Sequence, residues 1–115
     1  MKSKTNLSSK IALCALLAGC LTGWSVRADV ETTWTTNCQS CHGKDGKGGT
    51  MMGRKLGIKD LSDAKVQASF DDATAAKTIK EGVTVGGTEK MKGFGDKLSD
   101  DDVKALIAKV RSLKS

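Results

Sequence analysis

Two cysteines and a histidine stand close together at residues 38–42, where the chain reads Cys38-Gln39-Ser40-Cys41-His42. This C-x-x-C-H sequence is the pattern to which a c-type haem is attached. Two thiols three positions apart on a helical turn can each form a thioether with one haem vinyl group, and the adjacent imidazole can then face the iron. The spacing therefore predicts one haem c bound covalently at Cys38 and Cys41. His42, the only histidine of the chain, is the predicted iron ligand.

Other chemistries of a C-x-x-C pair fit this chain less well. A zinc site needs a fourth ligand of matching type, and no Cys or His follows His42. A thioredoxin-like redox pair needs a βαβ pattern, which the sequence does not show. A disulfide across C-x-x-C closes too small a loop to stabilise much. A zinc or thiol protein without haem stays open as an alternative.

The charge of the chain is unevenly distributed. The 115 residues carry a formal net charge of +6, but residues 1–28 hold four of the 19 basic residues and none of the 13 acidic ones. Residues 29–115 are therefore nearly balanced, and we expect no nucleic-acid partner. That region has only Trp34, Phe70 and Phe94 as aromatic side chains, which is little material for a core. The composition excludes a large enzyme and a polytopic membrane protein, and it suggests that a cofactor fills the interior.

The first 28 residues have the layout of a secretory signal. Three lysines precede an apolar run, and Val26-Arg27-Ala28 supplies small residues at a cleavage site after Ala28. The run is shorter than a membrane-spanning helix needs. A second reading competes, because Leu17-Ala18-Gly19-Cys20 resembles a lipobox, with residues 1–19 as lipoprotein signal and a lipid anchor on Cys20. Either reading predicts an exported, periplasmic domain at residues 29–115 with no membrane span in the mature chain.

The sequence of residues 29–115 predicts a small all-α domain. Helices are expected in three segments before the C-terminal one: 29–41, 63–70 and 72–81. Two glycine-rich segments, 43–57 and 82–97, predict irregular loops. No segment alternates polar and apolar residues, so we expect no sheet.

The C-terminal helix has the clearest pattern. Ser99 is a good N-cap, and Asp100, Asp101 and Asp102 place negative charge at the positive end of the helix dipole. Apolar residues then recur at helical spacing on one face. These residues are Val103, Leu106, Ile107, Val110 and Leu113.

The sequence resembles the class I c-type cytochromes, which are small exported monohaem electron carriers. The resemblance covers nearly all of residues 29–115 and rests on the C-x-x-C-H-Gly43 motif, the Gly46-Lys47-Gly48-Gly49 run, the stretch 91–99 and the closing helix. It implies the cytochrome c fold, in which three to four helices and glycine-rich loops surround one covalent haem and the terminal helices cross. It also implies that Met91 ligates the iron opposite His42. Met51 and Met52 follow His42 too closely to reach that face and are expected to anchor the loop against the haem.

This chain departs from the family pattern at several positions. Lys92 follows Met91 where family members commonly have proline, and the chain has no proline at all. In many family members the imidazole N–H of the ligand histidine donates to the carbonyl of a proline in the proximal loop. Because this chain has no proline, the imidazole N–H of His42 is expected to donate to a carbonyl near Met52 or Gly53. Lys109 replaces an aromatic residue of the last helix, so Trp34 is expected to contact only aliphatic groups.

The resemblance implies a one-electron carrier, not an enzyme, that works as a monomer between redox partner proteins. Phe70, Ile79 and Phe94 are expected to line the haem. Six lysines flank the two loops and would steer a partner with an acidic docking face, although an ordinary solvated surface explains them equally well. They are Lys44, Lys47, Lys55, Lys90, Lys92 and Lys97. A haem-based ligand binder or sensor, in which Met91 is off the iron or easily displaced, is the alternative function.

Overall fold

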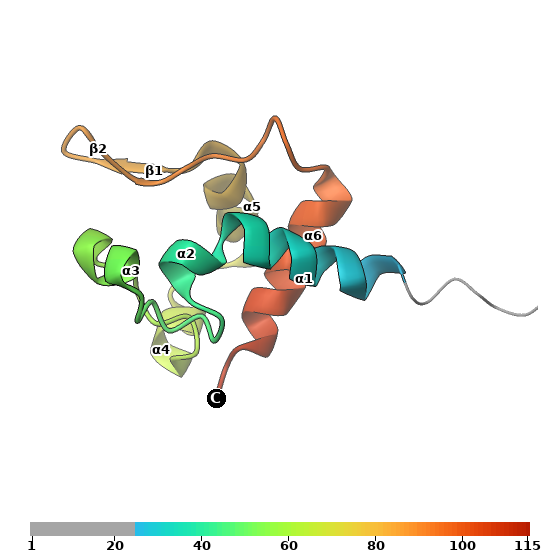
Figure 1. Cartoon of the computed structure of the whole chain (residues 1–115), viewed down its shortest axis with the longest axis horizontal. Coiled ribbons are helices and arrows are strands. Elements are labelled where there is room, and N and C mark those ends of the chain that lie inside the picture. Colours follow the sequence, from blue (N-terminus) through green and yellow to red (C-terminus); the bar gives the residue numbers. More distant parts are fainter. Residues whose placement is uncertain (1–24) are drawn as a thin grey trace, which may run out of the picture.

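The computed structural model describes residues 25–115, which fold mainly into helices (Figure 1). The helices of this region are α1 (Ser25–Asn37), α2 (Gln39–His42), α3 (Met51–Leu56), α4 (Ala64–Ala68), α5 (Asp72–Glu81) and α6 (Asp100–Ser112). Two short strands, β1 (Val83–Val85) and β2 (Thr88–Met91), pair between α5 and α6. The mainly helical architecture that the sequence predicts is confirmed, although more helical segments are present than the three to four expected.

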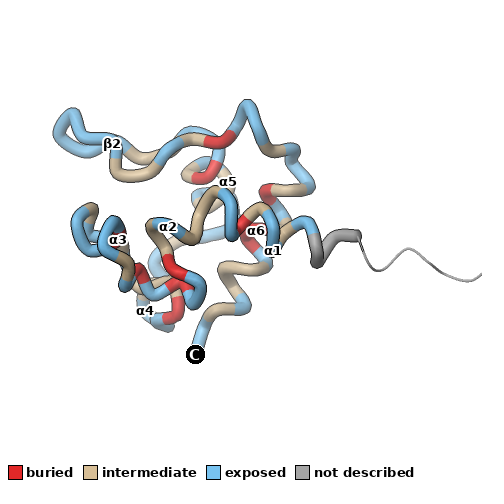
Figure 2. The backbone as a smooth tube through the Cα atoms, in the orientation of Figure 1, coloured by how far each residue is buried: buried red, intermediate tan, exposed pale blue. Residues whose placement is uncertain are grey.

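The core lies where α1, α5 and α6 meet. Helix α6 crosses α1 in Figure 1, and Val103, Leu106 and Ile107 of α6 bury the face that the sequence predicts. They pack with Trp34 of α1 and Ile79 of α5 in one cluster. Figure 2 shows further buried residues along the chain after α2. The crossing of the terminal helices therefore supplies most of the apolar core of the described region.

Local capping explains the helix ends that the sequence predicts correctly. Asp71 caps α5 by accepting from the backbone N–H of Thr74 at 2.7 Å, and the helix ends at Gly82. Ser99 and Asp102 form a reciprocal capping box at the start of α6. Helix α4 lies inside the predicted segment 63–70. These signals act within a few residues, so the sequence alone reveals them.

The end of α6 is tied to the segment between α4 and α5 by Arg111. Its guanidinium donates to the Gln67 backbone carbonyl at 2.6 Å and to the Gln67 side-chain oxygen at 2.9 Å. It also donates to the Phe70 carbonyl and to Asp72, both at 2.9 Å. Gln67 is buried, and its amide donates back to the carbonyl of Val110 at 2.7 Å.

The prediction that residues 43–57 form only a loop is wrong, because they contain α3. Thr50 caps this helix by accepting from Gly53 N–H at 2.9 Å, while its hydroxyl donates to the carbonyls of Ser40 and Cys41 at 2.8 and 3.1 Å. Gly53 is buried, and a Cβ there would collide with the carbonyl oxygens of Cys41 and Gly48. The glycine that argued against a helix is thus required by the close approach of α2.

The prediction of no sheet is also wrong, because residues 82–97 contain the β1–β2 hairpin. Its turn is Gly86-Gly87, with φ of 56° and 78°, and a two-residue turn with both φ angles positive matches the twist of paired strands. The strands are too short and too exposed to produce an alternating pattern.

The predicted helix over 29–41 is two helices, α1 and α2, with Cys38 at the junction. The predicted signal peptide, including Cys14 and Cys20, lies outside the described residues except for residues 25–28, which belong to the start of α1. Within residues 25–115 no helix is long and apolar enough to cross a membrane.

Candidate haem site

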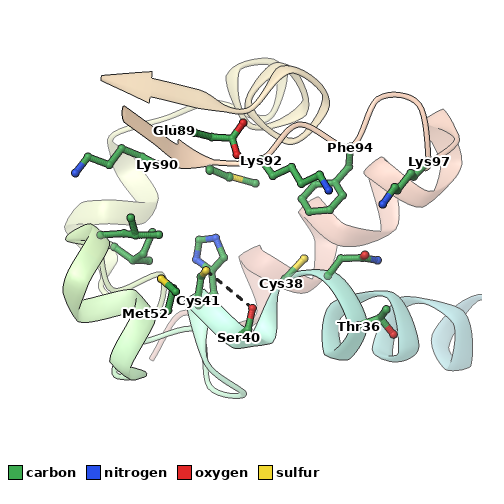
Figure 3. Close-up of a pocket in the computed structure, with 15 residues that line it drawn as sticks. Thr36, Cys38, Ser40, Cys41, Met52, Glu89, Lys90, Lys92, Phe94 and Lys97 are labelled. Atoms are coloured by element: carbon green, nitrogen blue, oxygen red, sulfur yellow. Dashed lines mark hydrogen bonds between the residues drawn. The ribbon is translucent and has the colours of Figure 1, made fainter. Parts of the chain in front are cut away.

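The C-x-x-C-H sequence forms one helical turn. The backbone N–H of His42 donates to the carbonyl of Cys38 at 2.9 Å, which closes the turn and places Cys38 and Cys41 one above the other. Both thiols are free. Figure 3 shows the two cysteine side chains rising from α2 on the side that faces the hairpin.

A pocket of about 440 Å³ lies between this turn and the hairpin, in the range of cofactor sites. His42 and Met91, which are 49 positions apart in the sequence, both line it together with Cys38 and Cys41. The tertiary structure therefore brings together all four residues that the sequence predicts for the site. The remaining lining residues are Thr36, Asn37, Ser40, Met52, Leu56, Ile58, Glu89, Lys90, Lys92, Phe94 and Lys97.

The donor set fits a c-type haem. Two free thiols one helical turn apart match two vinyl groups, and an imidazole and a thioether are soft or borderline ligands that suit low-spin iron. The Nδ1 atom of His42 is buried and has no hydrogen-bond partner among residues 25–115. The expected carbonyl near Met52 or Gly53 does not serve it, and the Gly53 carbonyl accepts instead from the N–H of Ile58 at 2.9 Å.

Burial governs the protonation of this site. It raises the pKa of the Cys38 thiol to about 11, with the neighbouring Cys41 adding to the rise and Lys109 opposing it. Burial lowers the pKa of His42. At neutral pH His42 is therefore a neutral imidazole, which is the form that binds a metal.

Trp34 is hydrogen-bonded to the end of the C-x-x-C-H turn. Its indole Nε1–H donates to the Gly43 carbonyl at 3.1 Å, and its ring centroid lies 5.8 Å from that of His42. The expectation that Trp34 contacts only aliphatic groups is wrong, because the Lys109 ammonium lies 5.3 Å from the centroid of its ring. The aromatic residue absent from the last helix is replaced by a cation–π contact.

Of the other residues expected to lie against the haem, some line the pocket and others do not. Phe94 and Met52 line the pocket, whereas Met51 is 83% exposed and is not part of its lining. Ile79 lies in the helical core instead, and Phe70 packs under the guanidinium of Arg111. Of the six lysines, Lys90, Lys92 and Lys97 line the pocket.

Further residues, which the sequence does not single out, shape the site from a distance. Thr50 links α3 to the carbonyls of the cysteine turn, and Gly82 and Gly93 hold the base of the hairpin that carries Met91. Threonine is a favoured N-cap residue, so Thr50 is a possible helix start that can be read in the sequence. The glycine pair has no such signal, because its members are far apart in the chain.

Comparison with known proteins agrees with this geometry. The family described as "Cytochrome C oxidase, cbb3-type, subunit III" matches residues 26–108. "Cbb3-type cytochrome c oxidase subunit FixP" of Azorhizobium caulinodans is 33% identical over 112 residues, which are 96% of this chain and 36% of that protein. The protein of the same name from Rhizobium meliloti (strain 1021) is 39% identical over 86 residues, which are 72% of this chain and 26% of that protein. The chain thus spans only a minor part of the length of either relative.

Solved structures give the same result. The "KustC0563 c-type cytochrome" is 35% identical with a TM-score of 0.64, and the match covers 74% of this chain and 96% of that chain. A mutant of the same protein is 36% identical with a TM-score of 0.65, over 75% of this chain and 99% of that chain. The chain therefore belongs to the family of cbb3-type cytochrome c oxidase subunit III and is a small c-type cytochrome, a protein of haem-based electron transfer.

Proposed function

We propose that this cytochrome is a one-electron carrier with a single haem, bound covalently by Cys38 and Cys41 and ligated by His42 and Met91. The observation that carries the proposal is the meeting of two thiols, an imidazole and a thioether in one pocket. A bound haem supplies an iron that gains and loses one electron, and a His/Met ligand pair raises its potential and leaves no open position.

Each residue of the proposed haem site has a distinct part in this function. Cys38 and Cys41 tie the cofactor to α2, and His42 is held beside them by the buried ring of Trp34. Met91 approaches from the hairpin, at the end of β2. Leu56, Ile58 and Phe94 surround the site with apolar groups that exclude water, which keeps the reorganisation on electron transfer small.

The partners are proposed to be redox proteins. The relatives are named as oxidase subunits, and Lys90, Lys92 and Lys97 place positive charge around the mouth of the pocket (Figure 3). Such charges favour a partner with an acidic docking face. We further propose that the carrier is monomeric and periplasmic, with residues 1–28 removed as a signal peptide or Cys20 lipidated; the intact mass of the mature protein distinguishes these two processing routes.

Covalent attachment is tested by haem staining on a denaturing gel. The wild type is expected to stain, and Cys38→Ala combined with Cys41→Ala is expected to remove the stain. Ser40→Ala, between the two cysteines, is the matched control and keeps it. An unstained wild type contradicts the proposal and returns the site to a zinc or thiol chemistry.

Axial ligation is tested by the ferric absorption spectrum. We expect the weak far-red band of methionine-sulfur ligation, which Met91→Ala removes. Met51→Ala is the control, because Met51 is 83% exposed. A high-spin wild type would instead support a ligand-binding or sensing haem.

A further inference from the structure

Lys109 of α6 is a nearly buried cation close to the proposed haem site. Its side chain is only 13% exposed. The ammonium donates to both carboxylate oxygens of Glu31 at 2.8 and 2.9 Å and lies 5.3 Å from the centroid of the Trp34 ring. A charge in this position is poorly screened by solvent and salt, because little water surrounds it.

The Trp34 ring connects this cation to the proposed iron ligand. It is 3% exposed, and its centroid lies 5.8 Å from that of the His42 ring, while its Nε1–H holds the Gly43 carbonyl. A cation, an indole and an imidazole thus follow one another from α6 to the end of α2. One packed side chain therefore separates the Lys109 charge from the His42 ring.

We infer that Lys109 is a positioning residue that raises the reduction potential of the haem through Trp34 and His42; the inference rests on the proposed function, with His42 as iron ligand. The oxidised iron carries one more positive charge than the reduced iron. A fixed cation nearby therefore disfavours the oxidised state, and more strongly where the surroundings are of low dielectric.

Glu31 makes the sign of this effect testable. Its carboxylate partly offsets the Lys109 charge, but its side chain is 63% exposed and so better screened by water. Removing the cation should lower the potential, and removing the carboxylate should raise it. A purely structural role for the ion pair gives no reason for opposite signs.

The experiment measures the haem midpoint potential of the full-length holoprotein. Lys109→Met, which keeps the length of the side chain and loses the charge, is expected to lower the potential. Lys104→Met makes the same charge change on the same helix at an exposed position and should move the potential less. Lys109→Arg, which keeps the positive charge beside the Trp34 ring, should have a potential close to that of the wild type.

Glu31→Gln is the second decisive variant, because it alters only an exposed partner and keeps a hydrogen-bond acceptor for Lys109. It is expected to raise the potential. The inference is overturned if Lys109→Met and Lys104→Met have the same potential, or if Lys109→Met lowers only the unfolding midpoint. If Lys109→Met does not hold haem, the inference is overturned by a Glu31→Gln variant whose potential equals that of the wild type. A wild type without stainable haem would overturn the proposed function itself, which separates the two failures.

Discussion

Gly82 and Gly93 lie backbone against backbone at the base of the hairpin that carries Met91. A Cβ added to Gly82 would lie 2.7 Å from the backbone nitrogen of Gly93 and would also collide with the Met91 carbonyl oxygen. Gly82 has φ 77° and ψ −171°, a region that is almost reserved for glycine. The chain after Gly93 then donates from Phe94 N–H to the Ile79 carbonyl at 2.9 Å. The base of the hairpin is thereby closed on the end of α5.

We expect Gly82→Ala to destabilise the fold and to weaken Met91 ligation. Strain in this backbone region costs about 1–3 kcal/mol, and the clash with backbone atoms adds to it. The loss is measured by urea unfolding, and the ligation by the far-red band. Gly87→Ala is the control, because Gly87 has φ 78° and no atom within 4 Å of an added Cβ. Equal losses in the two variants would show that the close packing at Gly82 has no role.

Replacing Arg111 by lysine is expected to destabilise the protein by about 1–3 kcal/mol, because the acceptors of the buried Gln67 lose their donor. Lysine cannot reproduce the planar set of donors that a guanidinium offers. Arg54→Lys is the control, since Arg54 makes a single exposed bond to the Gly49 carbonyl. Chemical unfolding measures both, and a loss at Arg111 no larger than at Arg54 would contradict the role of this contact.

The cap at Asp71 predicts a dependence of stability on pH. The hydrogen bond from Thr74 N–H lowers the pKa of the Asp71 carboxyl. Because the folded pKa is below the unfolded value of about 3.9, the stabilisation is fully present above that value and is lost as the pH falls through the folded pKa.

Asp71→Asn keeps a cap acceptor but does not titrate, so its stability should fall less than that of the wild type on acidification below about pH 4. Thermal unfolding at a series of pH values measures the difference. Asp96→Asn, at an exposed loop position, should follow the wild type. Identical acid slopes for Asp71→Asn and the wild type would refute the prediction.

The fold is expected to depend on covalent haem. Within residues 29–115 only six hydrophobic side chains are buried, and the 440 Å³ pocket separates the hairpin from α2 and α3. Cys38→Ser with Cys41→Ser should therefore lose cooperative unfolding and part of its helical circular dichroism, because small domains have little burial to spare. Ser40→Ala is the control. A double variant that unfolds as cooperatively as the wild type would show that the side chains suffice.

The lysines of the pocket rim should steer an acidic redox partner. Replacing Lys90, Lys92 and Lys97 together by glutamine is expected to slow association roughly 10-fold at low ionic strength, and less as salt screens the charges. The control replaces three exposed lysines outside the pocket, Lys59, Lys65 and Lys77. Stopped-flow rates across ionic strength measure both sets. A rate that does not depend on salt would exclude steering.

Local signals were enough for α5, α6 and the C-x-x-C-H turn. Asp71 and Ser99 cap their helices within three residues, and the cysteine turn is read from five consecutive positions. Helix α3 and the hairpin could not be found this way. Position 53 of α3 is a glycine because the Cys41 carbonyl of α2 leaves no room for a side chain, and the strands at Val83 and Met91 pair across a turn of two glycines. Helix α3 and the hairpin depend on contacts with residues outside the short stretch of sequence that forms each of them.

Residue types and short spacings establish Cys38, Cys41 and His42 as candidates for one haem, because covalent attachment needs neighbouring groups. Their roles and that of Met91 stay predictions. Only the tertiary structure brings Met91 into the pocket of His42, since that approach depends on backbone packing between Gly82 and Gly93. Only the crossing of α1 and α6 places Lys109 over Trp34. These side chains are 75 positions apart in the sequence and meet because the two helices pack together.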